Sequence, residues 1–167
     1  MKFSLPMLLL LFISCNEKID SNSKISKLKD SISPNDFYIE LYNDKKYVDS
    51  LLNKIENEGD SLAYNRIYSI SSLSGHYREL YYYQQIMAVK YNYPKAYFDM
   101  FNLMHLSDNV DLRKLSVYYL LKSCEMGYKR AIYYRSLFFL DEKDIPTANE
   151  YFVESDTTKF VHLKKMY

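Results

Sequence analysis

Residues 120–131 read LLKSCEMGYKRA, and this stretch carries the main signal for the fold. Its leucines belong to an apolar series with helical spacing, which Gly127 interrupts. Glycine readily adopts the left-handed backbone conformation that ends many helices. Ala131 follows four residues later, near the start of the next helical stretch. The segment therefore predicts a helix, a short turn and a second helix.

The same break occurs twice earlier in the chain. Three alanines recur at intervals of 33 and 35 residues, each four positions after a glycine or an asparagine. Asparagine is the other residue that tolerates the left-handed conformation. We expect the small alanines to let the two helices of an antiparallel pair approach closely. The repeat-defining residues are Gly59 and Ala63, Asn92 and Ala96, and Gly127 and Ala131.

This pattern resembles the tetratricopeptide superfamily and, within it, the Sel-like repeats. The resemblance covers roughly residues 45–140 and is closest over 120–131. It implies an all-α fold, a right-handed α-α superhelix of about three stacked helical hairpins. It also implies that the concave side of such a solenoid holds a protein segment or an extended peptide. A helical bundle without repeats is the alternative.

Helical periodicity predicts seven main helices, with a short helix before them over 36–42. Pro94 suits a first helical turn, and Asp111 and Asp144 are predicted N-caps. Phe160, Val161 and Leu163 are expected to form a closing turn at the end of the stack. The main helices are predicted over 44–57, 61–73, 78–91, 94–106, 111–126, 129–140 and 145–154.

The N-terminus has the form of a bacterial secretion signal. Lys2 precedes an apolar run that ends at Ile13, which is too short for a membrane-spanning helix of about 20 residues. The end of this run and the next two residues, Phe12-Ile13-Ser14-Cys15, resemble the lipobox of bacterial lipoproteins. That resemblance implies cleavage before Cys15 and acylation of Cys15, and two or more acyl chains hold a protein stably on a membrane. A cleaved signal with an incidental cysteine is the alternative.

Three regions follow from this interpretation: a signal peptide over 1–14, an acylated cysteine and flexible tether over 15–34, and a helical-repeat domain over 35–167. The tether is rich in Ser, Lys, Asp and Asn and has few apolar groups to offset the entropy of ordering. Asn16 follows the cysteine, and the resemblance to enteric lipoproteins implies an outer-membrane destination within the cell envelope. Whether the domain faces the periplasm or the outside stays open, as does its oligomeric state.

The composition excludes several function classes. The chain has 22 basic and 21 acidic side chains, and this near balance gives little electrostatic attraction to a phosphate backbone, so we expect no nucleic-acid partner. Its 3 glycines stand apart, so there is no phosphate-binding loop. The histidines His76, His105 and His162 lack metal-ligand spacing. Cys124 is expected to be a buried structural thiol. We therefore expect no cofactor, no metal and no enzymatic activity.

The 19 tyrosines suggest a binding surface. Consecutive residues of a helix point about 100° apart, so runs such as Tyr81–Tyr83 cannot face one core. Exposed tyrosines suit partner contacts, although their hydroxyls can also simply reach water from half-buried rings. The residues predicted to contact a partner are Tyr64, Tyr82, Tyr97 and Tyr134. The leading hypothesis is a lipoprotein that binds a protein or peptide in the envelope. The alternatives are an immunity lipoprotein that neutralises a toxin from a competing cell, and a structural factor in envelope assembly.

Overall fold

The computed structural model describes residues 33–139 and 145–153, and within these ranges it is helical with no strand. The prediction of an all-α fold is therefore confirmed. The contiguous unit that contains both ranges begins at Ser33. The predicted lipidation at Cys15, the N-cap at Asp144 and the closing turn at Phe160, Val161 and Leu163 lie outside the described residues.

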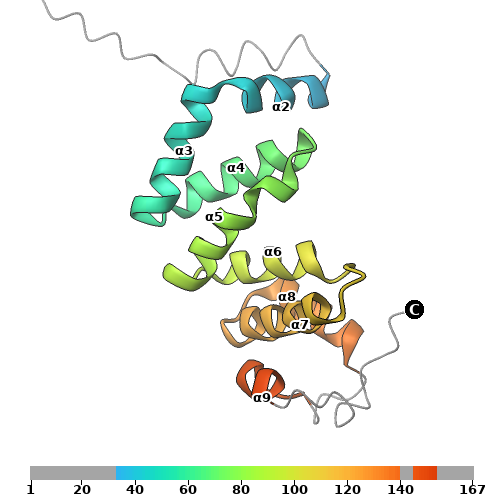
Figure 1. The fold of residues 1–167 in the computed structure, drawn as a ribbon. Helices are drawn as coiled ribbons and strands as arrows, with labels where there is room; N and C mark the ends of the chain where they lie inside the picture. The colour runs from blue at the N-terminus through green and yellow to red at the C-terminus, as the bar shows by residue number, and fades with distance from the viewer. Residues whose placement is uncertain (1–32, 140–144, 154–167) are drawn as a thin grey trace, which may run out of the picture. The chain divides into compact units, whose positions relative to one another are not determined.

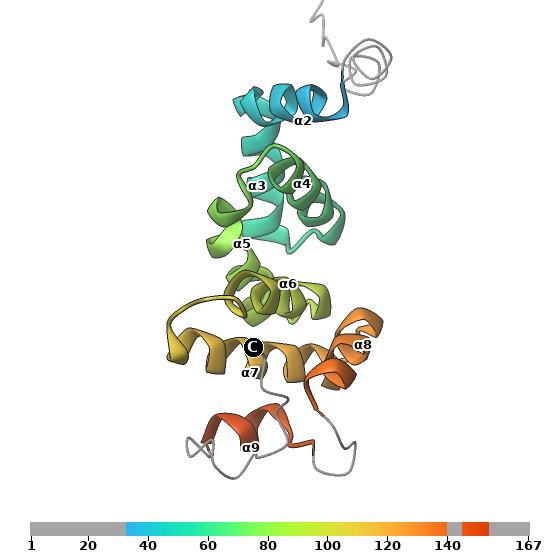
Figure 2. The ribbon, with the colours of Figure 1, turned by 90° about the vertical axis from the view of Figure 1, so that its right-hand side faces the viewer.

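The helices follow the predicted order and nearly the predicted bounds (Figure 1). Most of the packing joins helices that follow one another in the chain, such as α3–α4, α6–α7 and α7–α8, whereas α2 packs mainly on α4 and α9 packs on α7 (Figure 2). The elements are α2 (Pro34–Asn43), α3 (Lys45–Glu58), α4 (Ser61–Leu73), η1 (Tyr77–Leu80), α5 (Tyr81–Gln85), η2 (Ile86–Lys90), α6 (Pro94–Met104), α7 (Val110–Glu125), α8 (Lys129–Phe138) and α9 (Ala148–Val153).

Short polar side chains begin several of these helices. Asp60 accepts hydrogen bonds from the backbone N–H of Leu62 and Ala63 at the start of α4, at 2.8 and 3.1 Å. Ser33 and Pro34 begin α2, so the last two residues assigned to the tether belong to the domain. Such caps satisfy N–H groups that have no partner inside the helix.

The N-cap prediction at Asp111 is wrong. The helix α7 begins one residue earlier, at Val110, and Asn109 is its N-cap. The side-chain oxygen of Asn109 accepts from the N–H of Asp111 at 2.8 Å and of Leu112 at 3.2 Å. Asp111 lies in the first turn, where its negative charge still interacts favourably with the positive end of the helix.

The three predicted breaks share one backbone geometry, which Gly75 after α4 also adopts with a φ of 85°. Gly59, Asn92 and Gly127 have φ values of 64°, 50° and 79°, and each follows a helix. The residue after each of them donates its N–H to a carbonyl five or six residues back, as in Tyr128 to Ser123 at 3.1 Å. Left-handed residues thus reverse the chain at all three positions.

The alanines that follow these breaks are buried. Ala63 is 4% exposed, and Ala96 and Ala131 have no exposed surface. Each lies in the first turn of α4, α6 or α8. A methyl group at these positions lets the preceding segment pass close to the new helix, because a longer side chain would push the two apart.

The segment predicted as one helix over 78–91 is divided into three kinds of helix. It begins as a 3-10 turn, continues as α5 and ends as a π-helical turn over Ile86–Lys90, where the N–H of Tyr91 bonds to the carbonyl of Ile86. Met87 and Ala88, which are consecutive, are both buried within this π turn.

Candidate functional site

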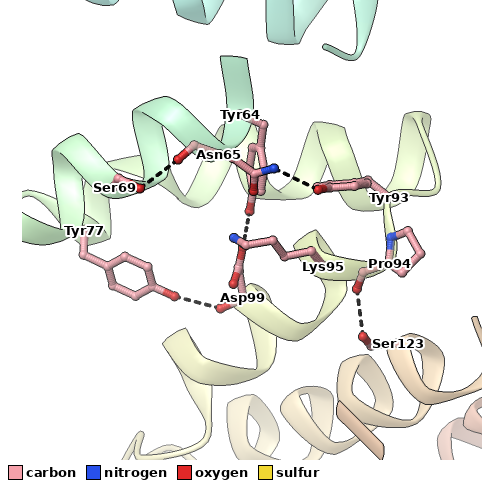
Figure 3. A network of polar contacts seen from close by, with 9 residues as sticks. All are labelled: Tyr64, Asn65, Ser69, Tyr77, Tyr93, Pro94, Lys95, Asp99 and Ser123. Atoms are coloured by element: carbon pink, nitrogen blue, oxygen red, sulfur yellow. Dashed lines mark hydrogen bonds and ion pairs between the residues drawn. The ribbon is translucent and has the colours of Figure 1, made fainter. Parts of the chain in front are cut away.

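A buried polar network joins α4, η1 and α6 (Figure 3). At its centre the carboxylate of Asp99 accepts a hydrogen bond from the hydroxyl of Tyr64 at 2.7 Å. The ammonium of Lys95, one helical turn earlier in α6, lies 2.6 Å from the same carboxylate oxygen. The hydroxyl of Tyr77 donates to the backbone carbonyl of Asp99 at 2.9 Å. Three separate segments of the chain therefore meet at one aspartate.

Aromatic rings enclose the Lys95 ammonium. Its nitrogen lies 3.6 Å from the ring centre of Tyr68 and 5.1 Å from that of Tyr64, which is the geometry of a cation–π contact. The side chain of Lys95 is 19% exposed and that of Asp99 is 3% exposed. The lysine thus contributes both a charge to the aspartate and a cation to the rings.

Burial controls the protonation of this group. Desolvation raises the pKa of Asp99 above its usual range, although Lys95 and the tyrosine hydroxyls act in the opposite direction. Desolvation lowers the pKa of Lys95, against the attraction of Asp99. It also raises the pKa of Tyr64 well above its ordinary value. The lysine and the aspartate neutralise each other, so the network holds helices together and offers little net charge to a ligand.

Two further hydrogen bonds position the start of α6. The amide of Asn65 in α4 donates to the hydroxyl of Tyr93 at 3.1 Å. The hydroxyl of Ser123 in α7 donates to the carbonyl of Pro94 at 2.7 Å. The first turn of α6 is therefore tied to the helix before it and to the helix after it, as the close-up shows (Figure 3).

An open cleft of about 660 Å³ lies where η1 and α5 meet the end of α6 and the start of α7. We call it the leucine cleft. Such a volume is in the range of protein ligand sites. Its walls are mostly apolar, and Tyr77 connects it to the polar network. The residues that line it are Tyr77, Arg78, Tyr81, Asn102, Leu103, Met104, Leu106, Ser107 and Leu112.

Several apolar side chains at the leucine cleft face water. Leu106 is 69% exposed, and Leu112 and Tyr81 are each 39% exposed. Leu106 and Leu112 flank the short polar connection between α6 and α7. Scattered exposed leucines are ordinary, but several around one concave surface make that surface a candidate binding site.

The four tyrosines predicted to contact a partner have different environments. Tyr64 has no exposed surface and Tyr97 has 5%, so both are buried, and neither of them lines the leucine cleft. Tyr134 is half-buried, with its ring 5.1 Å from Phe98. Tyr82 is 53% exposed and donates to Glu56 at 3.2 Å. The structure does not bring these four together as one surface.

The leucines of the cleft are missing from the residues predicted to contact a partner. One signal was available, because Leu106 directly precedes the polar residues Ser107 to Asn109. An apolar residue beside a polar connection is a candidate for exposure. Helical periodicity alone placed Leu106 inside a helix, whereas α6 ends at Met104.

Cys124 is buried, as predicted, and its thiol is free. Burial raises the pKa of its thiol to about 11, so little thiolate is present at neutral pH. Among residues 33–139 and 145–153, no three His, Cys, Asp or Glu side chains group as metal ligands would. Within the same ranges, none of the helices has both the length and the apolar character needed to cross a membrane.

No family model, no curated protein and no solved structure matches this chain.

Proposed function

We propose that the protein is a lipid-anchored lipoprotein of the cell envelope whose helical domain binds a segment of another protein. The observation that carries this proposal is the leucine cleft, an open apolar concavity with water-exposed leucines. Partner surfaces combine a desolvated apolar centre with a polar rim. The cleft has this composition, since Arg78, Asn102 and Ser107 stand among its leucines and tyrosines.

The chemistry of the cleft suggests the kind of segment that it binds. Leu103 and Met104 belong to the end of α6, and Leu106 and Leu112 lie beside them along the cleft. These side chains would pack against two or three apolar residues of the partner. Arg78 is exposed and can pair with a carboxylate that flanks those residues. The expected ligand is therefore a short apolar segment with an acidic neighbour.

We further propose that α3–α4, α5–α6 and α7–α8 form a right-handed tetratricopeptide-like superhelix. The support is the shared left-handed geometry at Gly59, Asn92 and Gly127 and the buried alanine after each. Superposition of the three hairpins in an experimental structure tests this. Successive hairpins should be related by one similar rotation, and unrelated rotations would favour a bundle without repeats.

The lipid anchor has its own test. In cells that grow on a labelled fatty acid, the parent protein should carry the label and remain with membranes after a high-salt wash. A Cys15→Ser variant should lose both properties, because the thiol that accepts the lipid is absent. Label retained by that variant would refute anchoring through Cys15.

Binding is tested with a matched pair of leucine variants. Leu106→Asp places a charge in the cleft, whereas Leu62→Asp changes a leucine that is 78% exposed at the start of α4, away from the cleft. Photo-crosslinking in native envelopes should join the parent and Leu62→Asp to the same protein. That protein, once purified, should bind both of them and should bind Leu106→Asp at least tenfold more weakly. Equal affinity of all three would refute the cleft as the binding site.

A further inference from the structure

A second concave surface is lined partly by α9, the last described helix. It has a volume of about 370 Å³ and lies among η2, α6, α7 and α9. We call it the terminal groove. None of the described residues that line it is charged, and the ring centre of Tyr118 in α7 lies 5.2 Å from that of Phe152 in α9. The lining residues are Val89, Tyr97, Leu115, Tyr118, Tyr119, Asn149, Phe152 and Val153.

The rim of the terminal groove exposes an unusual amount of apolar surface. Val89 is 61% exposed, Phe152 is 62% exposed and Val153 is 79% exposed. Phe152 and Val153 are consecutive and end the last described helix. Two large apolar residues side by side in water, next to an aromatic groove, are the features of a surface that something covers.

The residues that follow Val153 in the sequence are close enough to be candidates for covering the groove. Val153 lies on the groove itself, and the sequence continues from it through residues 154–167. That continuation has a polar stretch, Glu154 to Lys159, followed by the apolar residues Phe160, Val161 and Leu163. Seven residues of extended chain span at most about 25 Å, which is enough to turn back over a groove of this size.

We propose that residues 160–163 fold back into the terminal groove of the same molecule and cover Val89 and Phe152. A segment attached only a few residues from its binding surface has an effective concentration of about millimolar, so it competes well with any free partner. Lys159, Lys164 and Lys165 flank the apolar residues in the sequence, and their charges favour water on either side of a docked segment. The terminal groove is then an internal contact, separate from the leucine cleft.

The absence of tryptophan from the chain allows a direct test. In the full chain with Cys15→Ser, Phe160→Trp introduces a single tryptophan in the segment. Tyr133→Trp provides an exposed reference, because Tyr133 is 64% exposed on α8 and does not line the groove. The tryptophan at 160 should show blue-shifted emission and a several-fold lower acrylamide quenching constant than the one at 133.

Further variants locate the shielding. Val89→Asp puts a charge on the groove rim, and Leu163→Asp changes only the segment. Each should raise the quenching constant at position 160 toward that of the exposed reference. Val110→Asp is the matched control, since Val110 is 53% exposed and lies outside the groove, and it should change nothing.

Three results would overturn the proposal. The tryptophan at 160 would be quenched as strongly as the reference if the segment did not dock. Shielding that persists in Val89→Asp would place the segment on another surface. Shielding that weakens on dilution of the protein would show that a second copy supplies the segment.

Discussion

The buried ion pair of Lys95 and Asp99 predicts a specific order of stability among three variants. Asp99→Leu removes the acceptor for both the Lys95 ammonium and the Tyr64 hydroxyl. Removing one partner of a buried pair costs about 3–5 kcal/mol, because the other charge is left without compensation. Lys95 is 19% exposed and can partly reach water, so the loss in free energy of unfolding should be about 3 kcal/mol.

Removing both charges should be less harmful than removing one. The variant Lys95→Met with Asp99→Leu replaces the pair by apolar groups, a change that is often neutral or stabilising. Its remaining defect is the buried hydroxyl of Tyr64, which has lost its acceptor at a cost of about 1–3 kcal/mol. Adding Tyr64→Phe removes that hydroxyl, so the triple variant should return to within about 1 kcal/mol of the parent.

Urea unfolding followed by far-UV circular dichroism measures this series. The slope against urea should stay constant, so that shifts in midpoint report stability. Lys122→Met is the control, because it breaks the more exposed pair with Glu125 and should cost less than about 1 kcal/mol. The reasoning fails if Asp99→Leu is as stable as the double variant, or loses no more than the control.

Three further predictions concern helix ends, protonation and thiol reactivity. Gly59→Ala should lower the urea midpoint more than Gly127→Ala, because both glycines have a positive φ but only at Gly59 would the new Cβ lie 2.3 Å from the ring of Tyr91. Gly127→Ala should cost about 1–2 kcal/mol of stability, for the backbone strain alone. Equal midpoints of the two variants would contradict this prediction. The raised pKa of Asp99 means that the folded state keeps its proton above about pH 3.9, where the unfolded chain loses it. The contribution of Asp99 to the free energy of unfolding should therefore fall as pH rises from about 3.9 through the raised pKa. The difference in this free energy between the parent and Asp99→Asn, measured at several pH values, should decrease over that range. A difference that does not change with pH would contradict the prediction. In a Cys15→Ser chain, Cys124 should react with a disulfide reagent at pH 8 far faster after unfolding than before, and rapid reaction of the folded chain would refute its burial.

Most helices were predictable because their signals are local. The spacing of apolar residues identified the helical stretches. Pro94 begins α6, because the fixed φ of proline suits the first turn of a helix. Gly59, Asn92 and Gly127 end helices because few other residues adopt a positive φ at low cost. The cap at Asn109 was missed, since Asn109 and Asp111 are both good caps and only the first backbone turn distinguishes them.

The candidate site was much less predictable. Periodicity shows that one face of a helix is apolar, but in stacked helices two faces are covered by different neighbours. In addition, tyrosine occurs both in cores and on surfaces, so its presence does not indicate burial. Tyr64 and Tyr82 therefore look alike in the sequence, although the first is enclosed by α6 and the second is exposed.

The sequence alone determined where this chain is helical and where it turns, because those preferences depend on neighbouring residues. Only the tertiary structure decided that Tyr64, Lys95 and Asp99 form a closed network and that Leu106 and Leu112 stay in water. Burial depends on which distant segments pack together, and residues 35 positions apart, such as Tyr64 and Asp99, carry no local sign of that contact.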